Sequence, residues 1–225
     1  MKRVVRKFDD VLPKTISVLA RGGIAASQGK LAPTVRLFHQ ELLRMFLRAG
    51  QAPHVSQLVV PADRLGLEIV EAMSILAQAD LVHLDPETRA VAVAYPLSGW
   101  PSPHRVVLSG GTTLAAMCAV DAIGIPLMTG ESATISSSDP LTGQEIRVRH
   151  DAGLWMWEPS SAVVVLASDG CEGPIFAACT HTAFHATADL ASAYLSDRPS
   201  YTGRVLSQRE ATTVAEREFG SLLRA

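Results

Sequence analysis

The chain has 225 residues, of which 48% are hydrophobic and 19% are charged, so it is long enough to bury a substantial core. Its 20 Lys and Arg residues and 22 Asp and Glu residues give a net charge of −2, which argues against a basic surface for nucleic acid or an anionic membrane. Three cysteines, no apolar run of membrane-spanning length and no signal-peptide core after the basic start predict a cytoplasmic protein with free thiols.

The first third of the chain is mainly helical by pattern. Residues 1–33 are interpreted as an N-terminal extension, and an apolar stripe at helical spacing follows from Val35 to Phe46. A short helix over 55–59 comes next. Pro61-Ala62-Asp63 is a typical helix start, and it precedes a helix predicted over 65–79. A hairpin then pairs 81–84 with 90–95. Three helices and a hairpin in this order predict a winged-helix-like module over residues 34–97.

Such modules often bind DNA, but the charges of this one argue against it. The helix that would enter the groove carries Glu68 and Glu71, and Arg64 is the only cation near it. Contacts to phosphates need several Lys or Arg side chains. We therefore expect no nucleic-acid partner, and a packing or substrate-covering role for the module.

Residues 98–225 are predicted to form an α+β domain in which helices pack on a mixed or antiparallel sheet. A helix is expected from a cap at Thr112 or Thr113 to an end at Pro126. The remaining expected elements are strands at 105–108, 133–137, 145–148, 162–167 and 174–178, and helices at 182–195 and 207–223.

Cys118 and Asp121 are the first candidate functional residues. Three positions apart on a helix, they share one face, which places a thiol beside a carboxyl in an apolar segment. A thiol and an acid on a buried face can bind a soft electrophile and move a proton. From the pair alone, a small core cysteine and a partly exposed aspartate remain open as the alternative.

Two motifs in this half resemble the organomercurial (alkylmercury) lyases. The first is Cys-Ala-Val-Asp at 118–121, followed by Pro126, the strand at 133–137 and the turn at Thr142–Gly143. The second is Cys171, four residues ahead of Ile-Phe-Ala-Ala at 175–178, with the helical segment 188–192 behind it. The similarity extends over about residues 35–194.

The resemblance implies an enzyme of mercury detoxification that cleaves carbon–mercury bonds by protonolysis and releases a hydrocarbon and Hg(II). Cys118 and Cys171 would then be the mercury ligands and Asp121 the proton shuttle. Thiolates suit the soft Hg(II) ion, and an apolar site raises the pKa of a carboxyl toward a useful value. No cofactor is implied. The expected partners are an organomercurial substrate and a mercuric reductase or small thiols that accept Hg(II), and the protein is expected to be a monomer or a homodimer.

Two positions depart from the family pattern. Met117 stands where an aromatic residue commonly precedes the first cysteine, which affects how the organic group is held. Cys179 can also be aligned with the second motif. We prefer Cys171 as the second ligand because its spacing to Phe176 needs no gap, and this leaves Cys179 as an accessory thiol or a core residue.

The main alternative is a metal-binding or metal-sensing protein without catalysis, for example a winged-helix regulator. Cys179, His181 and His185 are close in sequence, the two histidines fall on one face of the predicted helix, and Cys171 could complete a site. The paired Cys-x-x-Cys signature of zinc sites is absent. A serine hydrolase is not favoured, because no Gly-x-Ser-x-Gly motif occurs.

Overall fold

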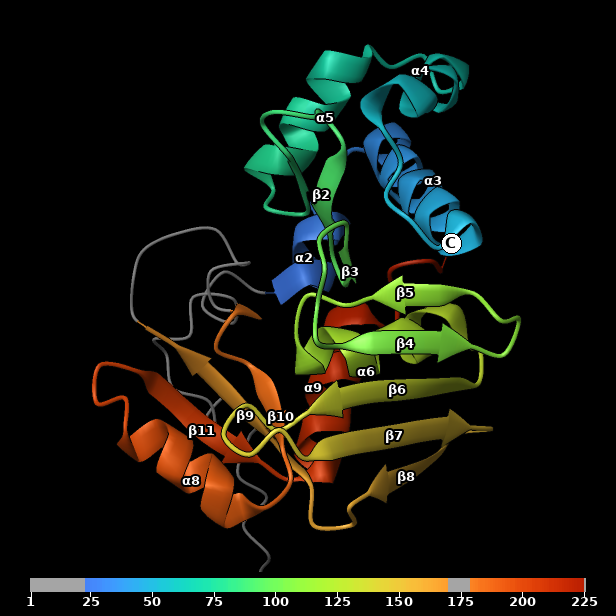
Figure 1. Ribbon diagram of the computed structural model, residues 1–225. Coiled ribbons are helices and arrows are strands. Elements are labelled where there is room, and N and C mark those ends of the chain that lie inside the picture. The colour runs from blue at the N-terminus through green and yellow to red at the C-terminus, as the bar shows by residue number, and fades with distance from the viewer. Residues whose placement is uncertain (1–22, 170–178, 225) are drawn as a thin grey trace, which may run out of the picture.

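The computed structural model describes residues 23–169 and 179–224, so Cys171 and the predicted strand at 174–178 lie outside the described part. The chain is α+β: helices come first, and antiparallel sheets with interspersed helices follow (Figure 1). No helix of the described segments is both long and apolar enough to cross a membrane.

The helix predicted from the apolar stripe is confirmed as α3 (Pro33–Ala49). Its inner face buries Val35, Phe38, Leu42 and Phe46. It ends where Gly50, at φ 68°, adopts the left-handed conformation and donates its N–H to the Phe46 carbonyl. The neighbouring helices are α2 (Gly23–Gly29), α4 (Val55–Arg64) and α5 (Ile69–Gln78).

The predicted boundaries of α4 and α5 are wrong. Pro61 lies inside α4 instead of starting a helix. The carbonyl that loses a partner at Pro61 belongs to the exposed Gln57, so water can replace that bond. The next helix begins later because Glu68 caps it, with its carboxylate accepting the backbone N–H groups of Val70 and Glu71.

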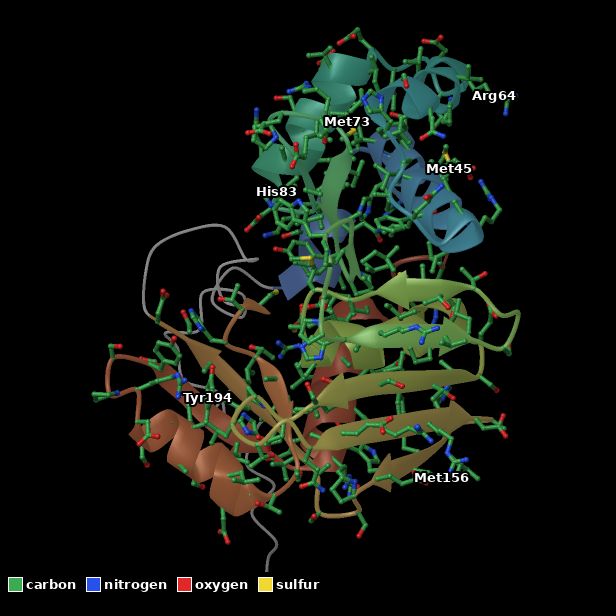
Figure 2. All side chains as sticks on the ribbon, viewed as in Figure 1. Met45, Arg64, Met73, His83, Met156 and Tyr194 are labelled. Carbon is green, nitrogen blue, oxygen red and sulfur yellow. The ribbon has the colours of Figure 1, made fainter. Side chains whose placement is uncertain are left out.

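The predicted hairpin is confirmed as two antiparallel strands, and a third strand extends it into a small sheet in the order β1-β2-β3. These strands are β1 (Val82–Leu84), β2 (Val91–Ala94) and β3 (Leu97–Ser98). The interpretation of residues 34–97 as a winged-helix-like module stays a prediction, as do the domain boundaries at residues 33 and 97. Arg64 lies at the end of the helical region that is remote from the large sheet (Figure 2).

The second half is built on two antiparallel sheets. The larger has the order β5-β4-β6-β7-β8, and the smaller has β10-β9-β11. Helices α6 and α9 lie behind the larger sheet, and α8 covers the smaller one (Figure 1). The elements are β4 (Arg105–Leu108), β5 (Thr113–Ala115), α6 (Ala119–Thr129), β6 (Ala133–Ser138), β7 (Glu145–Asp151), β8 (Leu154–Glu158), β9 (Val163–Ser168), β10 (Ala183–His185), α8 (Ala188–Ser196), β11 (Thr202–Leu206) and α9 (Gln208–Phe219).

Two predicted helices are shorter than expected because their first residues pair as strands. Residues 113–115 form β5, which pairs with β4 across the turn at Gly110–Gly111, and α6 then continues past Pro126 to Thr129. Residues 183–185 form β10, which pairs with 163–165 of β9, and α8 starts after the N-cap Thr187. Strand pairing depends on distant partners, which helical periodicity cannot reveal.

The close packing of α6 against α9 can be tested at Gly124. A Cβ added at Gly124 would lie 2.2 Å from a ring atom of Phe219. We expect Gly124→Ala to lower the free energy of unfolding by about 1–3 kcal/mol, because overpacking outweighs the gain of up to about 1 kcal/mol in helix propensity. Urea unfolding measures this. Gly29→Ala is the control, since a Cβ there meets no atom within 4 Å; equal effects of the two substitutions would contradict the packing argument.

Candidate active site

Cys118 occupies the N-cap of α6 and not the body of a helix. The chain reaches it from β5 in an extended conformation, with φ −152° and ψ −176° at Cys118. Two backbone hydrogen bonds fix this point: Met117 N–H donates to the Pro96 carbonyl and Ala119 N–H to the Thr182 carbonyl, both at 3.2 Å. The start of α6 is therefore held between the β2–β3 turn and the segment that follows Cys179.

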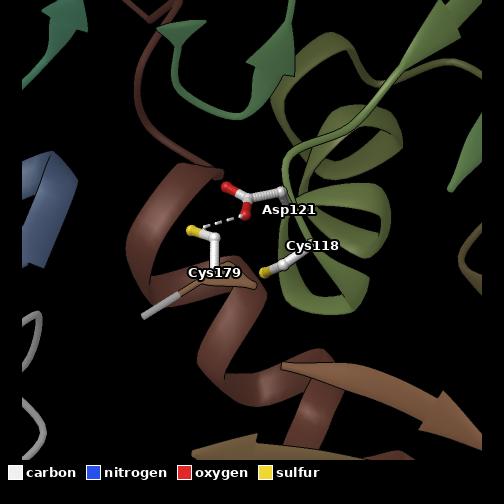
Figure 3. Close-up of side chains that lie close together, drawn as sticks. All are labelled: Cys118, Asp121 and Cys179. Carbon is white, nitrogen blue, oxygen red and sulfur yellow. Dashed lines mark hydrogen bonds between the residues drawn. The ribbon is translucent and has the colours of Figure 1, made fainter. Parts of the chain in front are cut away.

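Cys118, Asp121 and Cys179 meet at this point (Figure 3). One ligand atom from each of the three side chains lies within 4.8 Å of the others. The Cys179 thiol donates a hydrogen bond of 3.6 Å to Oδ2 of Asp121. All three residues are at least 92% buried. The result is a buried center with two thiols and one carboxyl.

Burial controls the acidity of the carboxyl. Removal from water raises the pKa of Asp121 from 3.8 to about 7, although hydrogen bonds with Cys118 and Cys179 act in the opposite direction. The negative charge of Glu218, a buried residue of α9, adds to the rise. A carboxyl with a pKa near neutrality can both accept and return a proton at physiological pH.

The two thiols are also less acidic than usual. Burial raises the pKa of Cys118. The pKa of Cys179 is raised well above its ordinary value, first by its hydrogen bond with Cys118 and then by burial. Without a bound electrophile, both sulfurs are therefore protonated at neutral pH.

A pocket of about 420 Å³ leads from the surface to Cys179. Met117 and Tyr194 contribute to its wall, and Trp100, which is 40% exposed, stands in the same lining. The ring of Tyr194 comes from α8 (Figure 2). A small molecule with an apolar group can thus approach the buried thiols from one side.

The structure brings together only part of the residues singled out in the sequence. Cys118 and Asp121 are neighbours, as their spacing indicates, and Cys179 joins them. Cys171 lies outside the described residues, so its role stays a prediction. Met117 lies beside the site in the pocket wall.

His181 and His185 do not share a helical face, and that expectation is wrong. His185 is in β10 and His181 precedes it. His181 Nε2 lies 3.6 Å from Asp169 Oδ2, and His185 Nδ1 lies 3.5 Å from Asp139 Oδ2. Within residues 23–169 and 179–224, the one group of three potential ligands that meets is Cys118, Asp121 and Cys179.

The sequence pattern gave no signal for Glu218, or for the turn at Tyr95–Pro96 that is bonded to the start of α6. Glu218 raises the pKa of Asp121 from α9, almost a hundred residues further along the chain. Tyr95 is a buried residue of the turn that contacts Met117 through Pro96. Both are placed by tertiary packing, so neither belongs to a local motif.

The fold and the site define an α+β protein with a buried center of two thiols and a carboxyl, suited to a soft metal. A family model described as alkylmercury lyase matches residues 97–220, just over half of the chain. The chain belongs to the alkylmercury lyase family, which is a family of enzymes.

Two individual proteins show the same relationship. The chain is 26% identical over 162 residues to an alkylmercury lyase of Streptomyces lividans, and the match covers 71% of this chain and 73% of that protein. It also shares the fold of a crystal structure described as the mercury-bound form of MerB2. That match has a TM-score of 0.70 and 21% identity, and it covers 90% of this chain and 98% of the other.

Proposed function

We propose that this protein cleaves the carbon–mercury bond of organomercurials by protonolysis, with Cys118 and Cys179 as mercury ligands and Asp121 as the proton shuttle. The observation that carries the proposal is the buried cluster itself, in which two sulfurs and a carboxylate oxygen lie within 4.8 Å of one another. Family membership supports the reaction class.

The two sulfurs supply affinity for the metal. Thiolates are the protein ligands that soft ions prefer, and two of them at one point can hold Hg(II) after the organic group has left. A second thiolate that binds an R–Hg center also increases the electron density at carbon, which makes this carbon basic enough to accept a proton.

The proton balance closes with Asp121. One thiol binds R–Hg–X and loses its proton with the leaving group as HX. The Asp121 carboxylate takes the proton of the other thiol, whose thiolate then binds mercury. When the carbon–mercury bond breaks, its electron pair stays on carbon and takes the proton from Asp121. The products are RH and Hg(II) bound by two thiolates, and Asp121 is again a carboxylate.

The hydrogen bond from Cys179 to Asp121 supports this route for the proton. A donor that already contacts its acceptor needs no rearrangement before transfer. The raised pKa values of the thiols argue that proton removal is a real barrier, which a carboxyl with a pKa of about 7 helps to lower.

Cys179 replaces Cys171 in this proposal because of where the fold places it. The sequence spacing favours Cys171, which the described residues do not include. Cys179 is within bonding reach of a metal held by Cys118, and it also lines the pocket. Its position therefore gives it both access to substrate and a partner for coordination.

The pocket is proposed to hold the organic group, and Met117 provides a flexible apolar wall in place of an aromatic one. The winged-helix-like module belongs to the same proposal as a cover of the site, since the Pro96 carbonyl binds the residue before Cys118. Small thiols or a mercuric reductase would remove Hg(II). The proposal includes no nucleic-acid partner, and the protein is proposed to be a monomer or a homodimer.

Release of benzene from phenylmercuric acetate in the presence of excess thiol is the direct test. We expect catalytic turnover, with one equivalent of Hg(II) formed per benzene. Gas chromatography measures benzene, and a mercury assay after removal of protein measures Hg(II). A folded parent protein that binds mercury without releasing benzene would contradict the proposal, and a stoichiometric native metal in the purified protein would favour the metal-sensing alternative.

A further inference from the structure

Tyr95 carries a buried hydroxyl group with no hydrogen-bond partner among the described residues. Its side chain is fully buried, at 0% exposure, in the turn between β2 and β3. A buried hydroxyl that lacks a partner costs about 1–3 kcal/mol. Phenylalanine would avoid this cost, so the hydroxyl calls for an explanation beyond packing.

The turn that carries Tyr95 is joined to the start of α6. Met117 N–H donates to the Pro96 carbonyl, and Leu97 pairs with Ala116 in an antiparallel bridge. The residue after Tyr95 is thus bonded to the residue before Cys118. In Figure 3 the same turn lies beside Asp121.

The pKa of the Tyr95 phenol responds to the charges of the site. Burial is the first cause that raises its pKa, and the charges of Cys179, Asp121, Asp80 and Cys118 add to the rise. Three of these four residues form the two-thiol, one-carboxyl center. The phenol therefore keeps its proton and is a permanent hydrogen-bond donor in the field of that center.

We infer that the Tyr95 hydroxyl is a fourth polar group of the site, which donates its hydrogen bond to the anion that forms there during the reaction. This inference rests on the proposed function and deepens it. The acceptor is the Cys179 thiolate, which forms when Asp121 takes the proton of this thiol.

The chemistry of the resting site explains why the donor is free. Both thiols are protonated, and Cys179 directs its hydrogen to Asp121. When Asp121 has taken this proton, the Cys179 thiolate is an acceptor without a donor in a buried site. A phenol placed there in advance can form a charge-assisted hydrogen bond with no reorganisation.

Tyr95→Phe removes only the hydroxyl and keeps the ring, which packs edge-on against His83 at a centroid distance of 6.4 Å. We expect kcat for phenylmercuric acetate to fall about 10- to 100-fold, as for loss of a hydrogen bond to a charged group, while KM stays within about twofold. The melting temperature is expected to stay equal or rise, because an unpaired buried hydroxyl is removed.

A spectroscopic measurement separates this inference from the proposed function. Mercuric chloride is added to the parent, to Tyr95→Phe and to the control Tyr201→Phe, and the near-ultraviolet absorption of tyrosine is recorded. The parent and Tyr201→Phe should show a tyrosine shift that Tyr95→Phe lacks. Tyr201 is the matched control because its ring packs on His181 and Tyr194 but is not part of the pocket lining.

The outcomes differ for the two proposals. Parent turnover with unchanged kcat in Tyr95→Phe, or a lower melting temperature that accounts for the lost activity, overturns the inference about Tyr95. Absence of turnover in the parent overturns the proposed function instead. In that case the tyrosine absorption shift on mercury binding still tests the inference about Tyr95. A shift that Tyr95→Phe lacks supports Tyr95 as a group of the site, and a parent without a shift overturns the inference.

Discussion

Cys179→Ser is expected to reduce kcat/KM for phenylmercuric acetate by a factor on the order of 10³ or more, as loss of an essential nucleophile does. The serine oxygen is a hard ligand and its proton is far less acidic than that of a thiol, so it can neither bind soft Hg(II) nor be deprotonated by Asp121. Initial rates of benzene release measure the effect. Cys118→Ser should show a similar loss.

Cys171→Ser is the decisive control for this prediction. All three substitutions replace sulfur by oxygen in a side chain of similar size, so differences between them report the role of each thiol. We expect Cys171→Ser to keep most of the parent activity. Loss of turnover with Cys171→Ser and its retention with Cys179→Ser would reverse the assignment and restore the preference from sequence spacing.

Retention of mercury gives the same comparison without catalysis. After mercuric chloride is added and weakly bound ion is removed with a small thiol, the parent should keep one Hg(II) per chain. Cys118→Ser and Cys179→Ser should lose it, because a single thiolate competes poorly with free thiol. Melting temperatures of the three variants show whether each one is folded.

The sequence predicts the part of this site that is local. Cys118 and Asp121 are three residues apart, and this spacing places them together whether Cys118 lies in the first turn of a helix or at its N-cap. Cys179 is 58 residues from Asp121. The segment after Cys179 is bonded to the start of α6 from the Ala119 N–H to the Thr182 carbonyl. The side-chain periodicity of these two segments does not predict this long-range contact.

The same difference between local spacing and long-range contacts explains which elements of the fold the sequence predicts. The stripe of α3 and the alternating strands β6 and β7 follow from side-chain period, and both are predicted from sequence. Residues 113–115 and 183–185 have neighbours with helical spacing, yet each segment becomes a strand because a partner strand is available beside it. Local preference decides an element only where tertiary pairing does not compete.

Asp121→Asn is expected to change activity and stability in opposite directions. The amide cannot accept or return a proton, so kcat should fall by a factor of about 10² to 10⁴, the usual contribution of a general acid–base group. At pH 8 the same variant should be more stable than the parent, because the parent must keep a charged carboxylate in a buried site.

The sign of the pH dependence follows from the pKa of Asp121. This pKa is about 7 in the folded protein against an ordinary value of 3.8, so between these values the folded state binds more protons than the unfolded state. The free energy of unfolding therefore falls as pH rises through this range. At about 1.4 kcal/mol per pKa unit, the difference reaches about 4 kcal/mol above pH 7.

Comparison of the parent with Asp121→Asn isolates this effect from the other titrating groups. The buried residues His39 and His104 have pKa values lowered from 6.5 to about 4. They therefore lower the free energy of unfolding as the pH drops below 6.5, whereas Asp121 raises it as the pH drops. Both proteins contain these histidines, and their effect cancels in the difference. Urea unfolding from about pH 4 to pH 8 gives the difference curve.

The difference should be small near pH 4 and should grow in favour of Asp121→Asn until about pH 7, where it levels off. A flat difference curve would show that Asp121 is not a buried carboxyl of raised pKa, and the proton shuttle would lose its physical basis. A rising curve together with full activity of Asp121→Asn would instead show that the carboxyl is buried as described but that the proton reaches carbon by another route.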